Sequence, residues 1–331
     1  GGWAVDRSFG GRTLMTMDGA EHLELRRCLD EKFRPRRVAE YIDDLVTPIA
    51  QARLEALLAR PQREADLLTD YFEPVSVLGL GEVLGLGHLP AERLQEWFHG
   101  LSMGAINFEG DADKQAANDA TAADIDRELR PLMERMSSEP DGSAIASLLT
   151  HGCPAGHARS IESVMPSIKV ILLGGMQEPG HAAASCLVGL LTHPEQLAWV
   201  REDPDRWDDV VHEALRWMPP IGTMQATALD DVPLGGAVIP RGALVSAVVA
   251  SACHDESLVA DPTRFDVHRV RRPNGAFGYG PHFCAGHQFA RDLERICLQL
   301  LVDAMPDLRL TAPVEFRGWE FRAPTSVPVA W

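Results

Sequence analysis

One cysteine stands in a setting that suits a metal-bound thiolate. Cys284 lies in the glycine-rich stretch 277–286 and precedes an amphipathic helical pattern that begins near His287. The dipole and free N–H groups of a helix N-terminus lower the pKa of a nearby thiol, and glycines let the backbone approach a flat partner closely. Two other interpretations are a glycine-rich turn around a buried free thiol and a zinc site of His282, Cys284 and His287. A zinc site normally has a second ligand pair at short spacing, which this pattern lacks.

A second candidate group, Glu178, lies where a long apolar helix is interrupted. Residues 163–191 predict one helix, and its first half is apolar nearly all round and therefore buried. Three glycines and a proline fall inside residues 174–180, at a cost of roughly 1 kcal/mol for each glycine and about 3 kcal/mol for the proline. So large a local cost indicates either two helices or a functional distortion. The Glu178 carboxyl can donate, accept or orient a proton, whereas the amide of Gln177 cannot act as an acid.

Two pairs of charged residues have spacings that place them on one helix face. His22 and Arg26 are four residues apart within a helical pattern over 17–38, and Glu213 and Arg216 are three apart in a later one. Arginine suits a carboxylate because its planar guanidinium can bond both oxygens at once. Each pair taken alone is also compatible with an ordinary solvated helix face.

The elements around these groups are mostly helical. Apolar residues recur at three- and four-residue spacing between 39 and 161. The stretches 237–240 and 243–249 predict two strands joined by a hairpin turn at 241–242. The sequence therefore predicts one mainly α domain with a small β region, and 331 residues that are 45% hydrophobic suffice for a substantial core.

Composition argues against several functional classes. A formal net charge of −17 would repel nucleic-acid phosphates, and no run of about eighteen apolar residues is present to span a membrane. The first residues lack the basic and apolar regions of a signal peptide, and six cysteines are scattered without CxxC spacing, which together predict a cytoplasmic protein. One basic cluster contrasts with the acidic background and could steer an acidic partner. It consists of Arg26, Arg27, Lys32, Arg34, Arg36 and Arg37.

Residues 277–286 read Phe-Gly-Tyr-Gly-Pro-His-Phe-Cys-Ala-Gly and resemble the haem-binding loop of the cytochrome P450 family, Phe-Gly-x-Gly-x-His/Arg-x-Cys-x-Gly, at every defined position. The resemblance implies the cytochrome P450 fold, mainly α with a small β region, and a haem b cofactor. It implies that Cys284 is the proximal iron ligand, whose thiolate donates electron density that favours O–O cleavage. His22 and Arg26 match the family's His-x-x-x-Arg pair, which binds a haem propionate. The implied cofactor-binding residues are His22, Arg26, Phe277, Gly278, His282, Cys284 and Gly286.

The interrupted helix resembles the family's long central helix, which opens over the haem at Ala/Gly-Gly-x-Asp/Glu-Thr. Gly174 and Gly175 match, but Gln177 stands where the acid is usual and Glu178 where the threonine is usual. Because the family's acid–alcohol pair relays protons at this place, the resemblance implies that Glu178 takes part in proton delivery; the other interpretation is a helix cap or ion-pair partner. The expected catalytic residues are Glu178, Gln177, Gly174 and Gly175. The Gly-Gly-x-Gln-Glu-Pro variant also resembles a bacterial subgroup that O-demethylates guaiacol-type aromatics.

The order of the motifs supports further assignments by resemblance. Between the central helix and the Cys284 loop, Glu213 and Arg216 match the family's Glu-x-x-Arg ion pair, and Arg264 is its expected third member. Ala226 stands where a propionate-binding arginine is often found, so the neighbouring strand is expected to line the substrate pocket instead. The expected pocket residues are Phe98, Val170, Gly174, Met224, Gln225, Pro324 and Thr325.

Together the motifs predict a single haem-binding domain over 1–331 that lacks the family's N-terminal portion, because the His-x-x-x-Arg helix comes early in the chain. The expected activity is that of a haem-thiolate monooxygenase, which inserts one oxygen atom of O2 into a small organic substrate such as a methoxylated aromatic by hydroxylation or O-dealkylation. Electrons are expected from an acidic ferredoxin or flavoprotein that docks near Arg26, Arg27, Arg34 and Arg37. The alternatives are a peroxide-using peroxygenase, a non-catalytic haem sensor and a haem-free helical interaction protein.

Overall fold

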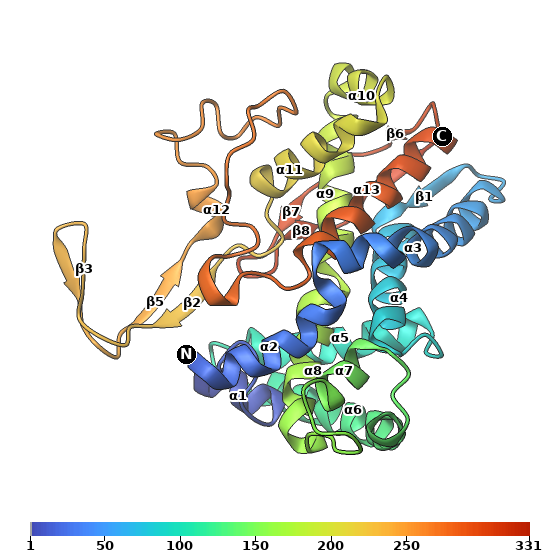
Figure 1. Cartoon of the computed structure of the whole chain (residues 1–331). Helices are drawn as coiled ribbons and strands as arrows, with labels where there is room; N and C mark the ends of the chain where they lie inside the picture. Colours follow the sequence, from blue (N-terminus) through green and yellow to red (C-terminus); the bar gives the residue numbers. More distant parts are fainter. Residues whose placement is uncertain (1) are drawn as a thin grey trace.

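Helices form most of the computed structural model, which describes residues 2–331, and short strands form four small sheets within that range (Figure 1). The helices are α1 (Gly2–Phe9), α2 (Gly19–Phe33), α3 (Pro35–Leu58), the π-helical η1 (Leu68–Phe72), α4 (Glu73–Leu84), α5 (Ala91–Ala105), α6 (Ala112–Ser138), α7 (Ala144–Thr150), α8 (Ile161–Met176), α9 (Glu178–Leu191), α10 (Pro194–Arg201), the 3-10 turn η2 (Pro204–Arg206), α11 (Trp207–Trp217), α12 (Val249–Ala252), the 3-10 turn η3 (Gly280–His282) and α13 (His287–Ala304). The strands are β1 (Glu64–Asp66), β2 (Met224–Thr227), β3 (Val232–Leu234), β4 (Ala237–Ile239), β5 (Leu244–Ala247), β6 (Arg309–Leu310), β7 (Phe316–Arg317), β8 (Ala323–Pro324) and β9 (Pro328–Ala330). None of these helices is long and apolar enough to cross a membrane.

The central helix runs in two parts, α8 and α9, which are separated only by Gln177. Ser160 caps the start of α8 by accepting a hydrogen bond from the Ser163 N–H, and α8 is buried on nearly all sides. α9 begins at Glu178, and Pro179 follows in the first turn, where a missing N–H removes no helical hydrogen bond. The predicted interruption is therefore confirmed, and the proline is accommodated by a new helix start.

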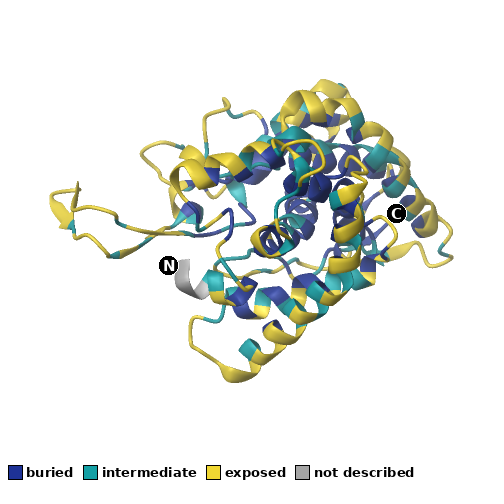
Figure 2. Ribbon diagram, turned by 60° about the horizontal axis from the view of Figure 1, so that its bottom comes forward, coloured by how far each residue is buried: buried dark blue, intermediate teal, exposed yellow. Residues whose placement is uncertain are grey.

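The two parts of the central helix both pack against α4 but otherwise have different neighbours. α8 contacts α4, α5 and α6, whereas α9 contacts α4, α11 and α13 (Figure 1). Gly175 and Gly180 permit two very close contacts, because a Cβ on Gly175 would lie 2.8 Å from Leu80 Cδ2 and one on Gly180 would lie 2.8 Å from Phe72 O. The break thus lies inside the helical body, where Figure 2 shows the buried residues gathered.

The β region differs from the predicted pairing. Strands β4 and β5 flank the turn at 241–242 as expected, but β4 pairs with β3 and β5 pairs with β2. Gly235 and Gly236 join β3 to β4 with φ of +59° and +83°, which is the pattern of a two-residue type I′ turn. The prediction of a hairpin between 237–240 and 243–249 was therefore wrong, because the adjacent glycines determine which strand β4 meets. The resulting ribbon projects from the body and is largely exposed (Figure 2).

Candidate active site

The loop around Cys284 is held by its own backbone. The Cys284 N–H donates to Phe277 O at 2.9 Å. Gly278 and Gly280 have φ of +71° and +70°, a region that favours glycine, so the path of the loop depends on both. The loop delivers Cys284 to the N-terminus of α13, whose first residue, His287, donates from Nδ1 to Cys284 O at 3.0 Å. The helix predicted to begin near His287 is thus confirmed.

The electrostatics of Cys284 differ from the sequence-based expectation. Burial raises the pKa of the Cys284 thiol, whereas we expected the helix N-terminus to lower it. The backbone N–H of Gly286 and the charge of Arg26 do lower that pKa, and Glu178 raises it. The helix end therefore favours the thiolate as predicted, but desolvation outweighs it. A metal ion at the sulfur would reverse this balance, because coordination deprotonates a thiol.

The alternative zinc site is not assembled. His282 Nε2 lies 3.1 Å from Asp18 Oδ1, and His287 bonds the backbone oxygen of Cys284. Within residues 2–331 no group of three or more His, Cys, Asp and Glu side chains is placed to hold a metal ion. The imidazoles near Cys284 therefore stabilise the loop and its contact with α2.

His22, Arg26 and His282 lie together beside the loop. The rings of His22 and His282 are 4.3 Å apart, and Arg26 Nη1 donates to Pro281 O at 3.5 Å across 255 residues of sequence. Burial lowers the pKa of His22, and the neighbouring His282 and Arg26 lower it further, which favours the neutral imidazole. Arg26 Nε also donates to Asp30 Oδ1 at 2.8 Å. The structure therefore places His22 and Arg26 of α2 next to the Cys284 loop.

The break between α8 and α9 borders open space at Gly174. Gly174 is exposed although most of α8 is buried, and a Cβ added there would meet no described atom within 4 Å. Gln177 Nε2 and Glu178 Oε2 are buried, and neither has a hydrogen-bond partner in the described part of the chain. Buried polar atoms without partners are uncommon and cost stability, so these two atoms indicate a place where a ligand or water binds.

Glu178 titrates close to neutral pH. Burial raises the pKa of Glu178 to about 7, and His181 and the backbone N–H groups of Glu178 and Gln177 lower it. Glu178 in turn raises the pKa of Cys284, so the carboxyl and the thiol influence each other's charge. A carboxyl with a pKa near the ambient pH is suited to proton transfer in both directions.

The residues on the two sides fit haem b. A Cβ on Gly174 or on Gly286 would meet no described atom within 4 Å, so both backbones leave room for a flat group. Cys284 offers one sulfur ligand, and Arg26 offers a cation that suits a propionate carboxylate. The donor set and the open space therefore match a planar, thiolate-ligated cofactor.

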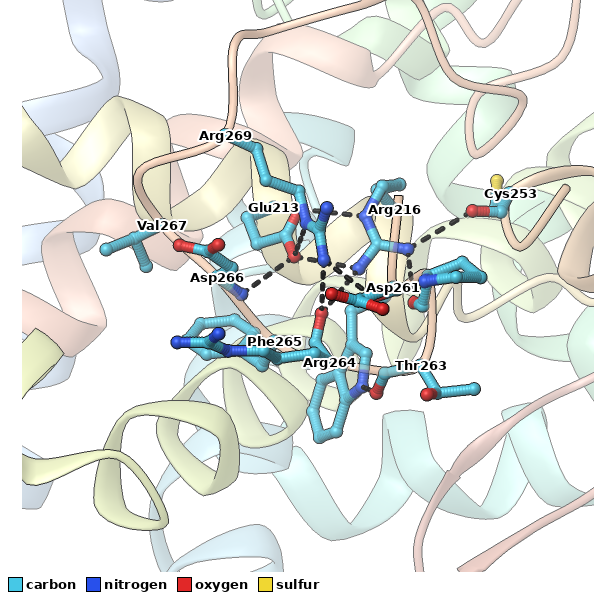
Figure 3. Close-up of polar contacts among 12 residues, drawn as sticks. Glu213, Arg216, Cys253, Asp261, Thr263, Arg264, Phe265, Asp266, Val267 and Arg269 are labelled. Carbon is cyan, nitrogen blue, oxygen red and sulfur yellow. Dashed lines mark hydrogen bonds and ion pairs between the residues drawn. The ribbon is translucent and has the colours of Figure 1, made fainter. Parts of the chain in front are cut away.

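A buried ion-pair cluster lies on α11, which packs against α13. Arg216 Nε and Nη2 donate to the two Glu213 carboxylate oxygens at 2.8 and 2.7 Å (Figure 3). The expectation that Arg264 is the third member was wrong, because Arg269 Nε donates to Glu213 Oε1 at 3.2 Å instead. Arg264 contributes only its backbone oxygen, which accepts from Arg216 and Arg269, since its own side chain is exposed.

The structure identifies neighbours of two predicted pocket residues. The ring of Phe98 packs edge-on against Phe321, with centroids 6.4 Å apart. Met224 lies against the Cys284 loop, because a Cβ on Gly278 would be 3.3 Å from Met224 Sδ. The structure therefore places Met224 beside the loop and an aromatic pair on α5 and the C-terminal segment.

The other predicted pocket residues differ in how far they are buried. Val170 on α8 and Pro324 on β8 are buried, whereas Gln225 and Thr325 are exposed. Gln225 points to the opposite face of β2 from Met224, because side chains alternate along a strand. The structure thus separates Gln225 from Met224, which sequence proximity had grouped together.

Sequence reasoning missed Arg269, Phe321 and a pair formed by His181 and Glu73, whose Nε2 and Oε1 atoms are 3.0 Å apart. Arg269 belongs to a basic run over 268–272, and nothing in that run indicates which member reaches Glu213. His181 could have been noticed, because it follows Glu178 by three residues and shares its helix face. Its partner lies 108 residues away, and no local signal indicates that contact.

Comparison with known proteins identifies the fold. Residues 207–304, which carry the ion-pair cluster and the Cys284 loop, match the protein family described as Cytochrome P450. The solved structure of P450BioI in complex with hexadec-9Z-enoic acid ligated acyl carrier protein aligns with a TM-score of 0.89 at 23% identity, over 99% of this chain and 82% of that one. Cytochrome P450 CYP109Q5 from Chondromyces apiculatus aligns with a TM-score of 0.83 at 26% identity, over 96% and 78%. The fold is therefore that of the cytochromes P450, a haem-dependent class.

Curated bacterial relatives agree with this class. Cytochrome P450 107B1 of Saccharopolyspora erythraea is 32% identical over 195 residues, which cover 58% of this chain and 48% of that protein. Nocardicin C N-oxygenase of Nocardia uniformis subsp. tsuyamanensis is 29% identical over 332 residues, which cover 96% and 79%. The chain spans about half the length of several curated relatives that it matches, including 54% of cytochrome P450 105A3 of Streptomyces carbophilus.

Proposed function

We propose that this chain is a haem-thiolate monooxygenase, an oxidoreductase that inserts one oxygen atom of O2 into a small organic substrate. The observation that carries the proposal is a pair of groups: Cys284 in a glycine loop at the start of α13, and Glu178, a buried carboxyl with a pKa of about 7 at the break of the central helix. Nocardicin C N-oxygenase and 6-deoxyerythronolide B hydroxylase of Saccharopolyspora erythraea, both similar in sequence, are named for oxygen insertion, which supports the reaction class.

In this proposal Cys284 Sγ binds the iron of haem b. Bound haem supplies an iron centre that accepts oxygen and electrons. His22 and Arg26 would bind a propionate from α2, and Gly174 would leave the backbone at the helix break open to the haem, whereas Gly175 packs against Leu80. The loop residues that hold the cofactor are Phe277, Gly278, His282 and Gly286.

Glu178 holds the proton that the reaction needs. Because its pKa is about 7, its Oε2 atom is protonated in a large fraction of molecules at neutral pH and can release the proton and take up another. Gln177 has a buried Nε2 group that can donate a hydrogen bond but cannot exchange its charge state. We therefore assign proton transfer to Glu178 and orientation of a bound ligand to Gln177.

A second candidate, peroxide-driven oxygen insertion, is favoured by the same carboxyl. A carboxylate at the helix break can accept a proton from hydrogen peroxide and return it, which an alcohol does poorly. The two candidates differ in the oxidant that they need, so parallel assays with peroxide and with an electron donor distinguish them.

We expect Glu178→Gln to lower electron-driven turnover by roughly 10²- to 10⁴-fold, because a positioned general acid contributes about that much. Wild-type turnover should fall as pH rises through about 7, since the protonated form of Glu178 is lost there. Glu178→Thr, which places an alcohol at this position, should recover part of the electron-driven rate and none of the peroxide-driven rate. Equal rates for wild type and both variants in both assays would remove Glu178 from the mechanism.

Stability against pH provides a control for Glu178 that needs no turnover. Its folded pKa of about 7 lies above the ordinary value of 4.5, so folding takes up a proton between these values. The contribution of the protonated Glu178 carboxyl to the free energy of unfolding is complete below pH 4.5 and is lost as pH rises through about 7. The loss amounts to about 3 kcal/mol. Denaturant titrations should therefore show Glu178→Gln gaining stability relative to wild type as pH rises. If the difference in free energy of unfolding between Glu178→Gln and wild type did not change with pH, Glu178 would not be a buried carboxyl with a raised pKa.

We propose a methoxylated aromatic as the substrate. The Gly-Gly-x-Gln-Glu-Pro sequence at the break resembles the guaiacol-demethylating subgroup, and the Phe98–Phe321 pair offers ring edges and faces to an aromatic guest. Titration of the haem-loaded protein with guaiacol, and with phenol as the control lacking the methoxy group, tests this by the change in the haem spectrum. A response to neither compound, or a stronger response to phenol, would exclude the proposed substrate.

We propose that an acidic ferredoxin or flavoprotein docks on the basic cluster of α2 and α3. Arg27, Arg34 and Arg37 are exposed, although Arg37 Nη1 lies 2.9 Å from Glu40 and is partly neutralised. Reversal of charge in Arg34→Glu/Arg37→Glu should slow electron transfer and weaken its salt dependence, because an opposite-sign patch steers association.

A double variant with the same charge change elsewhere, Arg135→Glu/Arg241→Glu, serves as the control for docking, since Arg135 lies on α6 and Arg241 in the turn between β4 and β5. Stopped-flow reduction at several salt concentrations measures the rates. If both double variants behave like wild type, the docking site is elsewhere.

A further inference from the structure

His181 on α9 and Glu73 on α4 form a hydrogen-bonded pair near Glu178. His181 Nε2 lies 3.0 Å from Glu73 Oε1, and the two side chains are 12% and 13% exposed. Gln95 Nε2, on α5, lies 3.5 Å from the other Glu73 oxygen. The pair therefore stands between the interior and the surface, where it can exchange protons with solvent.

Backbone packing fixes the pair. Glu73 is the first residue of α4, and Gly180 of α9 faces it. A Cβ on Gly180 would lie 2.8 Å from Phe72 O and 3.2 Å from Glu73 N, so only glycine lets the two backbones approach this closely. Because Gly180 directly precedes His181, this contact brings the imidazole to the Glu73 carboxylate.

The pair is coupled to Glu178 through α9. Glu178 and His181 are three residues apart, which places them on one helix face. Burial raises the pKa of Glu178 to about 7, and the charge of His181 is the strongest of the effects that lower it. Two other titratable groups lie near Glu178 and His181: Cys284, whose pKa responds to Glu178, and Glu73, which bonds His181. On the α5 side the neighbour of Glu73 is the neutral Gln95.

We propose that His181 and Glu73 form a proton relay that connects Glu178 to solvent, a role that rests on the function proposed above. When Glu178 Oε2 releases its proton into the space in front of it, the imidazolium of His181 passes its Nδ1 proton, by way of water in that space, to the Glu178 carboxylate. The Nε2–H group of His181 stays bonded to the Glu73 carboxylate, which stabilises the imidazolium, and Nδ1 then takes up a proton from solvent. One proton enters at the surface for each one released inside. His181 acts through Glu178 and is therefore a positioning residue.

Glu73→Gln and His181→Gln separate a relay from a structural contact, because both keep a hydrogen-bonding side chain that cannot carry a proton. We expect kcat to fall about tenfold or more in each variant with KM unchanged, and Glu73→Asp to keep most of the rate. His193→Gln is the matched control. His193 lies just beyond the end of the same helix, where its Nδ1 bonds Gly189 O at 2.9 Å.

A second readout uses the resting protein and needs no turnover. Infrared spectroscopy over a range of pH follows the carboxyl stretch of Glu178, which Glu178→Gln identifies by its disappearance. Loss of the neighbouring positive charge should raise the pKa of Glu178 in His181→Gln, and to a smaller extent in Glu73→Gln. The pKa should stay as in wild type in His193→Gln.

Unchanged kcat and an unchanged Glu178 pKa in both relay variants would overturn the proposal, and so would a loss of folding in both, since the pair would then be structural. If instead the wild-type protein lacks the spectrum of thiolate-bound haem, the proposed function fails. The infrared titration still decides in that case whether His181 and Glu178 are coupled.

Discussion

Cys284→Ser is expected to abolish turnover and the spectrum of thiolate-bound haem while leaving the fold intact. A serine hydroxyl stays protonated at neutral pH and binds iron weakly, whereas a cysteine thiolate is a strong, soft ligand. The bond from the Cys284 N–H to Phe277 O does not involve the side chain, so the loop should keep its path. Haem content, circular dichroism and the ferrous–CO spectrum of the variant measure these effects.

Cys153→Ser is the matched control for this prediction. Cys153 is another partly buried free thiol, but it follows α7 and lies outside the Cys284 loop. The control should retain both the spectrum and the activity of wild type. A Cys284→Ser protein that kept the thiolate spectrum would mean that another of the cysteines binds the iron.

Glu213→Ala should lower the free energy of unfolding by about 3–5 kcal/mol, the largest stability effect that we expect from a single substitution. Glu213 is 3% exposed and Arg216 is 6% exposed, so the pair is almost fully removed from water. Loss of the carboxylate leaves the guanidinium groups of Arg216 and Arg269 without their shared anion (Figure 3). Denaturant titration of the two proteins under the same conditions measures the difference.

Arg264 and Arg269 provide the control for the ion-pair cluster. Arg269→Ala should cost about 2 kcal/mol, because its side chain donates to Glu213 and to the backbone oxygen of Asp261. Arg264→Ala should stay within about 0.5 kcal/mol of wild type, because only its backbone oxygen takes part. A larger loss for Arg264→Ala than for Arg269→Ala would contradict this arrangement.

The parts of the site that sequence predicts well are those determined over a few residues. The glycines around Cys284 require a particular local backbone, and the start of α13 at His287 follows directly from it. The interruption at Gln177 is likewise local, because three glycines and a proline raise the cost of continuing one helix. Motif resemblance adds the mainly helical fold, which the structure confirms.

The parts that sequence predicts poorly depend on contacts between distant segments. Arg264 and Arg269 are both arginines in one loop, and only the crossing of that loop over α11 selects Arg269. The pKa of Cys284 depends on the balance between a helix end and burial, and burial is a property of the whole fold. The contact of Glu73 with His181 depends on the approach of α4 to α9.

The ferrous–CO spectrum of the wild-type protein loaded with haem b tests the central claim, that Cys284 and the loop around it hold a thiolate-ligated haem. The account predicts a Soret band at the long wavelength that distinguishes thiolate ligation from histidine ligation. A protein that takes up no haem, or one whose ferrous–CO band lies at the position typical of a histidine ligand, would contradict it.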